Sequence, residues 1–98
     1  MFWCKIFQTT HEVVAAICDE KLIEKVLDKK DRKIKISRNF YGGQLIDEKM
    51  AVKVMRNSTI GNLIGEDAIE MADRNGFISK ENIILIDEIP HAQFVKLK

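Results

Sequence analysis

The sequence predicts an α+β domain, and two observations lead to this prediction. Apolar runs rich in β-branched and aromatic residues lie at both ends of the chain, whereas apolar residues in the middle recur at helical spacing. Strands gathered at the ends with helices between them are typical of a mixed or antiparallel sheet with helices packed mainly on one face. The expected element order is ββαβααββ.

Length and composition predict one compact domain over residues 1–98. A chain of 98 residues buries somewhat under about 70% of its unfolded surface and has no material for a second core. Its 46% hydrophobic and 32% charged residues match globular rather than disordered chains. We expect a cytoplasmic location, because the longest apolar stretches are far shorter than the roughly 18 residues of a membrane span and the first residues lack a signal-peptide pattern.

The first expected elements are two strands. Residues 1–8 and 12–18 are apolar runs separated by a polar turn, which predicts an antiparallel hairpin. Cys4 and Cys18 lie on these two runs, and one cysteine pair in a chain that can build a core indicates buried thiols rather than a disulfide. Neither a CxxC motif nor a His/Cys cluster at ligand spacing occurs, so no metal and no other cofactor is expected.

Two helices are expected after acidic capping residues. Asp19 stands at an N-cap position, and the apolar spacing that follows predicts a helix from about Glu20 to Lys29. Asp47 takes the same position before a second helix, which carries Ala51, Val54 and Met55. Lys29 and Lys30 place positive charge at the end of the first segment, as the helix dipole favours.

A third helix is expected after Ser58 and is predicted to end at Gly76 in a Schellman motif. Gly61 and Gly65 lie within it, although each costs about 1 kcal/mol relative to Ala in a helix interior. We favour tight packing of this helix as the compensation, with close approach of a ligand, or a helix that begins only at Glu66, as alternatives. Its apolar stripe comprises Ile60, Leu63, Ile64, Ala68, Met71 and Ala72.

Three further strands are predicted. Residues 33–37 alternate, with Ile34 and Ile36 on one face and lysines on the other, as in a half-buried strand with a basic outer face. Residues 82–86 and 92–98 are apolar runs on either side of a polar break and the single proline, and both are expected to be strands.

Gly42 and Gly43 follow two aromatic residues and have two interpretations. They can form a turn, or they can hold a ligand. The segment lacks the lysine and hydroxyl of a phosphate loop and lacks a GxGxxG pattern, which favours the turn. If either glycine has a positive φ, its replacement by alanine is expected to destabilise the fold.

Charge is distributed unevenly, although the whole chain has a net charge of only +1. Residues 21–38 contain eight basic and three acidic residues, a local charge of +5, whereas residues 62–88 contain seven acidic and two basic residues, a local charge of −5. A basic strand followed by Phe40 and Tyr41 suits an RNA backbone with a stacked base. Opposed charges also suit self-association or docking on another protein.

His91 follows the proline, and sequence alone gives it two interpretations. A histidine held by structural hydrogen bonds is favoured over a catalytic pair with Cys18, because a catalytic base must lie within hydrogen-bond reach of its nucleophile. His11 lies in the predicted turn, where solvation is the simplest interpretation.

Four motifs together resemble a known family. "CDE" at residues 18–20, "NFYGGQLID" at 39–47, "TIGNLIGE" at 59–66 and "IPHAQ" at 89–93 are similar to a family of small archaeal proteins classified only as a domain of unknown function, number four hundred and twenty-four. The resemblance covers nearly the whole chain. It implies an archaeal origin and a cytoplasmic location, and it supplies no substrate.

The resemblance also suggests which residues act together. We expect its polar motif residues to converge around the glycine corner and to form one binding surface made of Tyr41, Gly42, Gly43, Asn62, Glu66, His91 and Gln93.

The function expected first is that of a noncatalytic binding module. It would contact RNA or a ribonucleoprotein through Lys33, Lys35 and Arg38. One alternative is an enzyme in which His91 is the acid or base and Glu66 its partner, acting on a small anionic ligand. Another is a structural subunit whose "GNLIG" helix packs against a second protein.

Overall fold

A computed structural model describes residues 1–97. The described strands are β1 (Phe2–Gln8), β2 (Val13–Asp19), β3 (Val26–Lys29), β4 (Arg32–Lys35), β5 (Gln44–Ile46), β6 (Ile60–Ile64), β7 (Ile84–Ile86) and β8 (Ile89–Val95). The described α-helices are α1 (Arg38–Tyr41), α2 (Glu48–Arg56) and α3 (Glu66–Arg74), and 3-10 turns cover Glu20–Leu22 and Lys80–Asn82.

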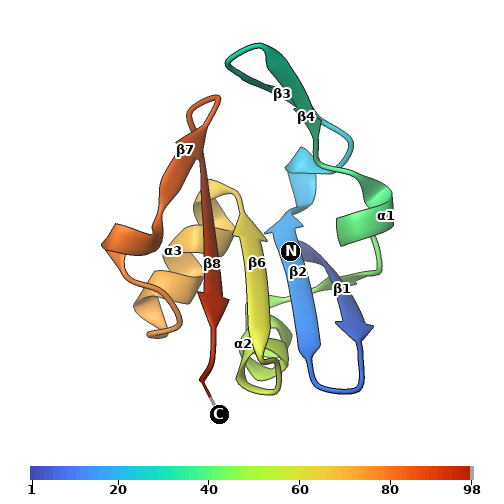
Figure 1. Ribbon diagram of the computed structural model, residues 1–98. Coiled ribbons are helices and arrows are strands. Elements are labelled where there is room, and N and C mark those ends of the chain that lie inside the picture. Colours follow the sequence, from blue (N-terminus) through green and yellow to red (C-terminus); the bar gives the residue numbers. More distant parts are fainter. Residues whose placement is uncertain (98) are drawn as a thin grey trace.

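Six strands form a mixed sheet in the order β5-β1-β2-β6-β8-β7, and β3 pairs only with β4 in a separate hairpin. Neighbours in the sheet are antiparallel except for the parallel pair β2 and β6. Figure 1 shows α2 and α3 behind the sheet and the β3–β4 hairpin beyond its upper end. The predicted α+β class, with helices mainly on one face, is confirmed. Within residues 1–97, no helix has the length and apolar character needed to cross a membrane.

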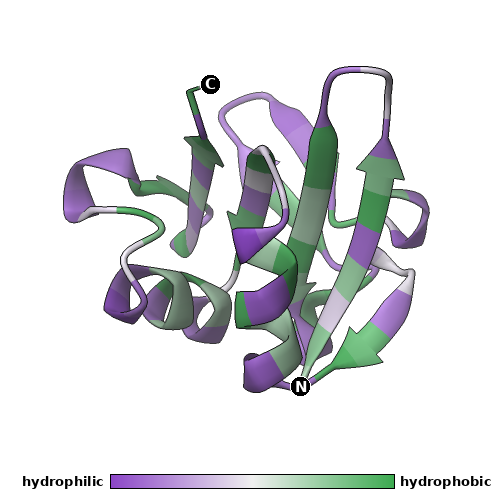
Figure 2. Ribbon diagram, turned by 90° about the horizontal axis from the view of Figure 1, so that it is seen from below, coloured by the Kyte–Doolittle hydropathy of each residue, from purple (hydrophilic) through white to green (hydrophobic). Residues whose placement is uncertain are grey.

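Two cores lie on opposite faces of the sheet. The core beneath α2 and α3 includes Cys4, Met55 and Met71, and the core beneath α1 and the hairpin includes Cys18 and Tyr41. The strands through the middle of the molecule are mostly hydrophobic and the turns mostly hydrophilic (Figure 2). Both cysteines are buried free thiols, as predicted, and the sheet separates them.

The helix predicted from Glu20 to Lys29 is wrong. One 3-10 turn is followed by strand β3, and Glu24 between them has a φ of 69° that ends any helix. The chain then folds back, because the Glu24 amide donates to the Ile36 carbonyl at 2.7 Å and the Ile36 amide donates to the Lys25 carbonyl at 2.8 Å. The helical spacing of the apolar residues gave a wrong prediction, because Leu22 is buried from the 3-10 turn and Leu27 from strand β3.

The helix predicted after Ser58 is also wrong in its first half. Residues 60–64 form the central strand β6, and α3 begins only at Glu66, which confirms the alternative start. Gly65 joins the two elements with a φ of 117°. The Ser58 hydroxyl does not cap a helix start but donates to the Val54 carbonyl, in the last turns of α2. Gly61 leaves room for the Phe94 ring, so it serves packing within the sheet and not a helix face for another chain.

Other local predictions are confirmed. The Asp47 carboxylate accepts from the Met50 amide at 2.9 Å and caps α2. The end of α3 is a Schellman motif, in which the Phe77 amide donates to the Ala72 carbonyl and the Gly76 amide to the Asp73 carbonyl. The strands expected at 33–37, 82–86 and 92–98 correspond to β4, β7 and β8, and residue 98 lies outside the described residues.

Candidate functional site

Asn62 is the centre of a polar cluster on the sheet face that carries α1. Its Oδ1 atom accepts a hydrogen bond from the Tyr41 hydroxyl at 2.9 Å and lies 3.0 Å from Nε2 of His91. Asn62 lies on β6, His91 on the adjacent β8 and Tyr41 at the end of α1. Three motifs that are far apart in the sequence therefore meet at one amide group.

The single turn of α1 positions the aromatic side chains. Ser37 caps it, since its Oγ accepts from the Phe40 amide at 3.2 Å and its carbonyl accepts from the Tyr41 amide at 3.0 Å. The Phe40 and Tyr41 rings are nearly perpendicular, at 88° and with centroids 4.8 Å apart. Tyr41 consequently points into the core face, whereas Phe40 stays 36% exposed.

The polar cluster lines a pocket of about 240 Å³ between the sheet, α1 and the hairpin. The walls contributed by the hairpin and the sheet are aliphatic, and Lys35 and Phe40 also line the pocket. A mainly apolar recess with a few convergent polar groups is the usual form of a ligand site. Its aliphatic residues are Ile34, Ile36, Ile64 and Ile86.

Burial favours the neutral forms of His91 and Tyr41 in this pocket and of Cys18 beside it. Burial lowers the pKa of His91, and the nearby Lys29 charge acts in the same direction. Burial raises the pKa of Tyr41 and raises the pKa of the neighbouring Cys18 to about 12. A neutral His91 that donates from Nε2 to the Asn62 oxygen fits the geometry, so the cluster is a hydrogen-bonding device rather than a charged one.

Aromatic and basic side chains of β1 contact α1 on the same face of the sheet. Phe40 stacks on Phe7 with centroids 5.4 Å apart, and the Arg38 guanidinium lies 5.3 Å from the centre of the Trp3 ring. Lys5 donates to the Asn39 carbonyl at 2.8 Å and lies 5.3 Å from the Phe7 ring.

Sequence analysis missed the contribution of strand β1 to this surface. The available signal was the alternation along that strand, in which Phe2 and Cys4 face one core and Trp3 and Phe7 face the other side.

The predicted RNA-contacting cations lie beside the pocket and already have acidic neighbours. Lys33 pairs with Asp28, and Lys35 and Arg38 lie 3.4 Å and 3.9 Å from the Glu24 carboxylate. All three cations are more than half exposed in their side chains. Exposed pairs of this kind contribute little to stability because water and salt screen them, so a phosphate can compete for these cations.

Two predicted site residues do not line the pocket. Glu66 begins α3, which packs on the other face of the sheet, so it does not converge with Tyr41, Asn62 and His91 as expected. Gln93 is opposite Asn62 in the β6–β8 register and exposed, yet it lies outside the pocket lining. The group that contacts His91 is Asn62.

Gly42 and Gly43 connect α1 to β5 and form a turn, as predicted. Among the described glycines, positive φ values occur at Gly65 and Gly76, so backbone strain is not the reason for this pair. Instead, a Cβ on Gly42 would overlap the backbone and side chain of Arg38, and a Cβ on Gly43 would overlap the Cys4 carbonyl oxygen. The glycines permit close backbone approach and do not line the pocket.

The Cys18 and His91 pair is not formed. Each is the register partner of Ile64, on opposite sides of β6, so a whole strand lies between them. Cys18 is fully buried and its thiol has a raised pKa, which suits a core residue. The described residues contain no group of three or more His, Cys, Asp or Glu side chains that could hold a metal ion.

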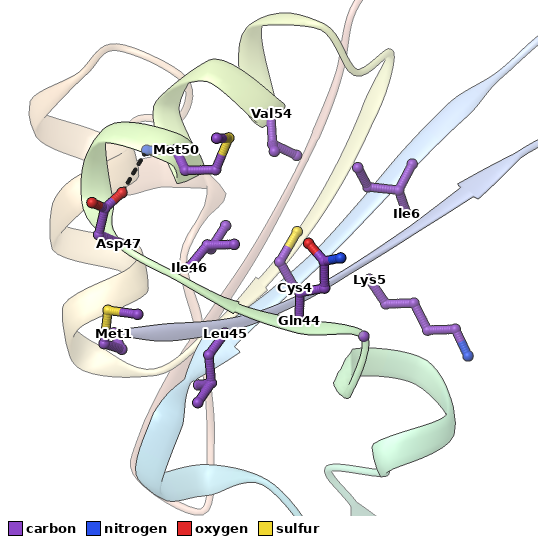
Figure 3. Close-up of a pocket in the computed structure, with 11 residues that line it drawn as sticks. Met1, Cys4, Lys5, Ile6, Gln44, Leu45, Ile46, Asp47, Met50 and Val54 are labelled. Atoms are coloured by element: carbon purple, nitrogen blue, oxygen red, sulfur yellow. Dashed lines mark hydrogen bonds between the residues drawn. The ribbon is translucent and has the colours of Figure 1, made fainter.

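A larger and more open groove of about 900 Å³ runs between β1 and α2. Figure 3 shows Met50 and Val54 of α2 above Ile6 and Cys4 of β1, with the Asp47 carboxylate bonded to the Met50 amide. The groove is mainly apolar, and its carboxylate already caps the helix. Of the predicted site residues, only Gly43 borders it, so the polar pocket is the better candidate site.

The fold and the pocket define a small α+β protein with a hydrogen-bonded polar cluster on one face of a mixed sheet. The chain belongs to the family described as "Protein of unknown function (DUF424)", whose model matches residues 7–97. It is similar to an uncharacterized conserved protein from Methanopyrus kandleri, whose crystal structure has a TM-score of 0.85 at 27% identity, covering 99% of this chain and 94% of that one. No functionally curated protein gives a significant match.

Proposed function

We propose that this protein is a noncatalytic module that binds single-stranded RNA, free or within a ribonucleoprotein, in the cytoplasm. The binding surface is the pocket together with the side chains around its mouth, and we call it the RNA face. It consists of Lys33, Lys35, Arg38, Phe40, Tyr41, Asn62 and His91.

The observation that carries this proposal is the combination of an exposed ring, nearby cations and a polar pocket on one surface. Phe40 borders the pocket, stacks on Phe7 and stays partly exposed. Stacking of a base on an aromatic ring contributes about 1–3 kcal/mol, and neighbouring cations follow the phosphate backbone. Lys35 lines the pocket, and Arg38 precedes Phe40 by two residues on α1.

The enzyme alternative has less support. It requires a proton-transfer partner for His91, and the partner proposed from sequence, Glu66, does not line the pocket. The other titratable groups that line it are Lys35 and Tyr41, and burial raises the pKa of Tyr41. A neutral histidine bound to an amide oxygen suits recognition better than general acid or base catalysis.

Fluorescence anisotropy of a labelled single-stranded RNA, titrated with the protein at low and moderate salt, tests the proposal. We expect micromolar binding that weakens with salt. In the variant with Lys33, Lys35 and Arg38 all replaced by alanine, the slope of log K against log salt should fall in magnitude by about 2, because three phosphate contacts are lost.

The matched control replaces Lys49, Lys53 and Arg56 of α2 by alanine. It removes the same number of charges from the helix behind the sheet. Equal weakening in both variants would show non-specific attraction, and absence of wild-type binding at low salt would refute the proposal.

A further inference from the structure

We propose that the pocket accepts a pyrimidine base of the RNA, and that the Asn62 amide Nδ2 group donates to a carbonyl oxygen of that base. This inference rests on the proposed function and adds a preference for base type. It follows from which hydrogen-bonding atoms of the polar cluster are occupied and which are open.

The oxygen of Asn62 is already saturated. A carboxamide oxygen has two acceptor positions, and here one serves the Tyr41 hydroxyl and the other His91 Nε2. Burial keeps His91 neutral at pH 7, so the imidazole has one N–H group. With that group at Nε2, it donates to the Asn62 oxygen and is not available to a ligand. Asn62 therefore cannot accept a further hydrogen bond from a ligand.

The nitrogen of Asn62 is open. Its Nδ2 group has two donor hydrogens, and within residues 1–97 no acceptor is bonded to it. No side-chain nitrogen or oxygen of the described chain is both sealed from solvent and without a partner. Since Asn62 is only half-buried and lines the pocket, Nδ2 is accessible to whatever enters.

Because the Asn62 amide offers a ligand a donor (Nδ2) but no free acceptor, it can bind some bases better than others. Asparagine recognises adenine by bidentate bonding, donating from the amide nitrogen and accepting on the amide oxygen. That mode is closed here, because the Asn62 oxygen is engaged twice. Uracil and cytosine both present carbonyl oxygens on a single ring, and these are acceptors of the kind that Nδ2 requires. Guanine also has a carbonyl oxygen, but on a larger two-ring base, so the choice of a pyrimidine over guanine rests on the size of the pocket.

The size of the pocket agrees with a single small ring. A volume of 240 Å³ has room for about eight water-sized groups, since a water occupies about 30 Å³. Aliphatic walls from Ile34, Ile64 and Ile86 suit the faces of a flat ring. Lys35 also lines the pocket and can neutralise the phosphate of the same nucleotide.

Anisotropy titrations with three labelled decamers, oligo(U), oligo(C) and oligo(A), test the inference with wild-type protein and Asn62→Asp. Aspartate keeps both acceptor positions for Tyr41 and His91 but replaces the ligand-facing donor by an acceptor. We expect the wild type to bind oligo(U) and oligo(C) at least about tenfold more tightly than oligo(A), a difference of about 1.4 kcal/mol. In Asn62→Asp this ratio should fall to about one, with the melting temperature retained.

Asn39→Asp is the matched control. It makes the same amide-to-carboxylate change on exposed α1, next to Phe40 but outside the pocket lining. The added negative charge should weaken all three decamers equally and leave their ratio unchanged.

The outcomes separate the two proposals. Failure of all decamers to bind would refute the RNA-binding function itself. Salt-dependent binding without a pyrimidine preference, or a preference that survives in Asn62→Asp, would leave the RNA function standing and refute the base pocket. An Asn62→Asp chain that fails to fold would shift the decision to the wild-type ratio, where equal binding of oligo(A) overturns the inference.

Discussion

His91 has a neutral imidazole because its folded environment disfavours the charged form. Burial is the larger cause and the Lys29 charge the smaller, and both lower its pKa below the ordinary value of 6.5. A group with a lowered folded pKa of this kind stabilises the fold only while the imidazole is neutral. The stabilisation is therefore complete above the unfolded pKa and is lost as the pH falls through the folded one.

We expect the wild-type melting temperature to fall between pH 7.5 and pH 5 by more than that of His91→Gln. Glutamine can donate to the Asn62 oxygen but does not titrate, so the difference between the two proteins isolates His91. Asp19, whose own pKa is raised by burial, contributes equally to both and cancels. Thermal melts followed by circular dichroism provide the measurement, and identical pH profiles would contradict the assignment.

At the scale of the elements, Asp19 links strand β2 to helix α3, although sequence analysis assigned it to a different helix. Asp19 was expected to cap a helix directly after it. Instead its carboxylate accepts from the amides of Asp67 at 3.1 Å and Ala68 at 2.7 Å, and so caps α3 from the end of β2. Gly65 permits this contact, since a Cβ there would overlap the Asp19 carboxyl group.

Asp19→Ala should destabilise the protein by about 2 kcal/mol, because it leaves two amides at the start of α3 without their acceptor. In a domain of this size such a loss lowers the melting temperature by roughly 8–16 °C. Asp47→Ala is the comparison, since that exposed cap makes one bond, to Met50, and should cost only about 1 kcal/mol. Equal stability of Asp19→Ala and the wild type would contradict this account of the cap.

Local sequence patterns predicted helices and strands correctly where a continuous apolar pattern corresponds to a single helix or strand. Two apolar runs separated by a polar turn predicted the β1–β2 hairpin, and a cap with helical spacing predicted α2. The same spacing failed for residues 58–65, because Leu63 and Ile64 are buried on opposite faces of the sheet, a pattern that merges with the apolar stripe of α3. Only tertiary packing distinguishes a strand from a helix over these residues, although Gly61 and Gly65 already disfavoured a helix.

The part of the site that consists of the sequence-motif residues was predictable. Tyr41, Asn62 and His91 were expected to converge, and they share one hydrogen-bonded group. Glu66 was misplaced because its position depended on the erroneous helix. The aliphatic walls of the pocket were not predictable, since they come from strands that meet only when the hairpin folds over the sheet.

At the scale of the whole molecule, the sheet separates two different surfaces. The basic hairpin and α1 lie with the polar pocket on one face, and the acidic start of α3 lies with the opposite core. The separation is incomplete, because α2 also carries Lys53 and Arg56 on that far side. Charge alone therefore does not distinguish the proposed RNA face from the opposite side of the sheet. The feature that distinguishes it is the polar pocket with Phe40 at its edge.

Nuclear magnetic resonance titration of the isotope-labelled protein with an oligo(U) decamer would locate the RNA-binding surface residue by residue. We expect the largest shifts at the Asn62 side-chain amide, the His91 imidazole and the backbone of Arg38–Tyr41, while α2 and α3 stay nearly unchanged. Shifts concentrated on α2 or α3, or no shifts at a large excess of RNA, would contradict the proposed RNA face.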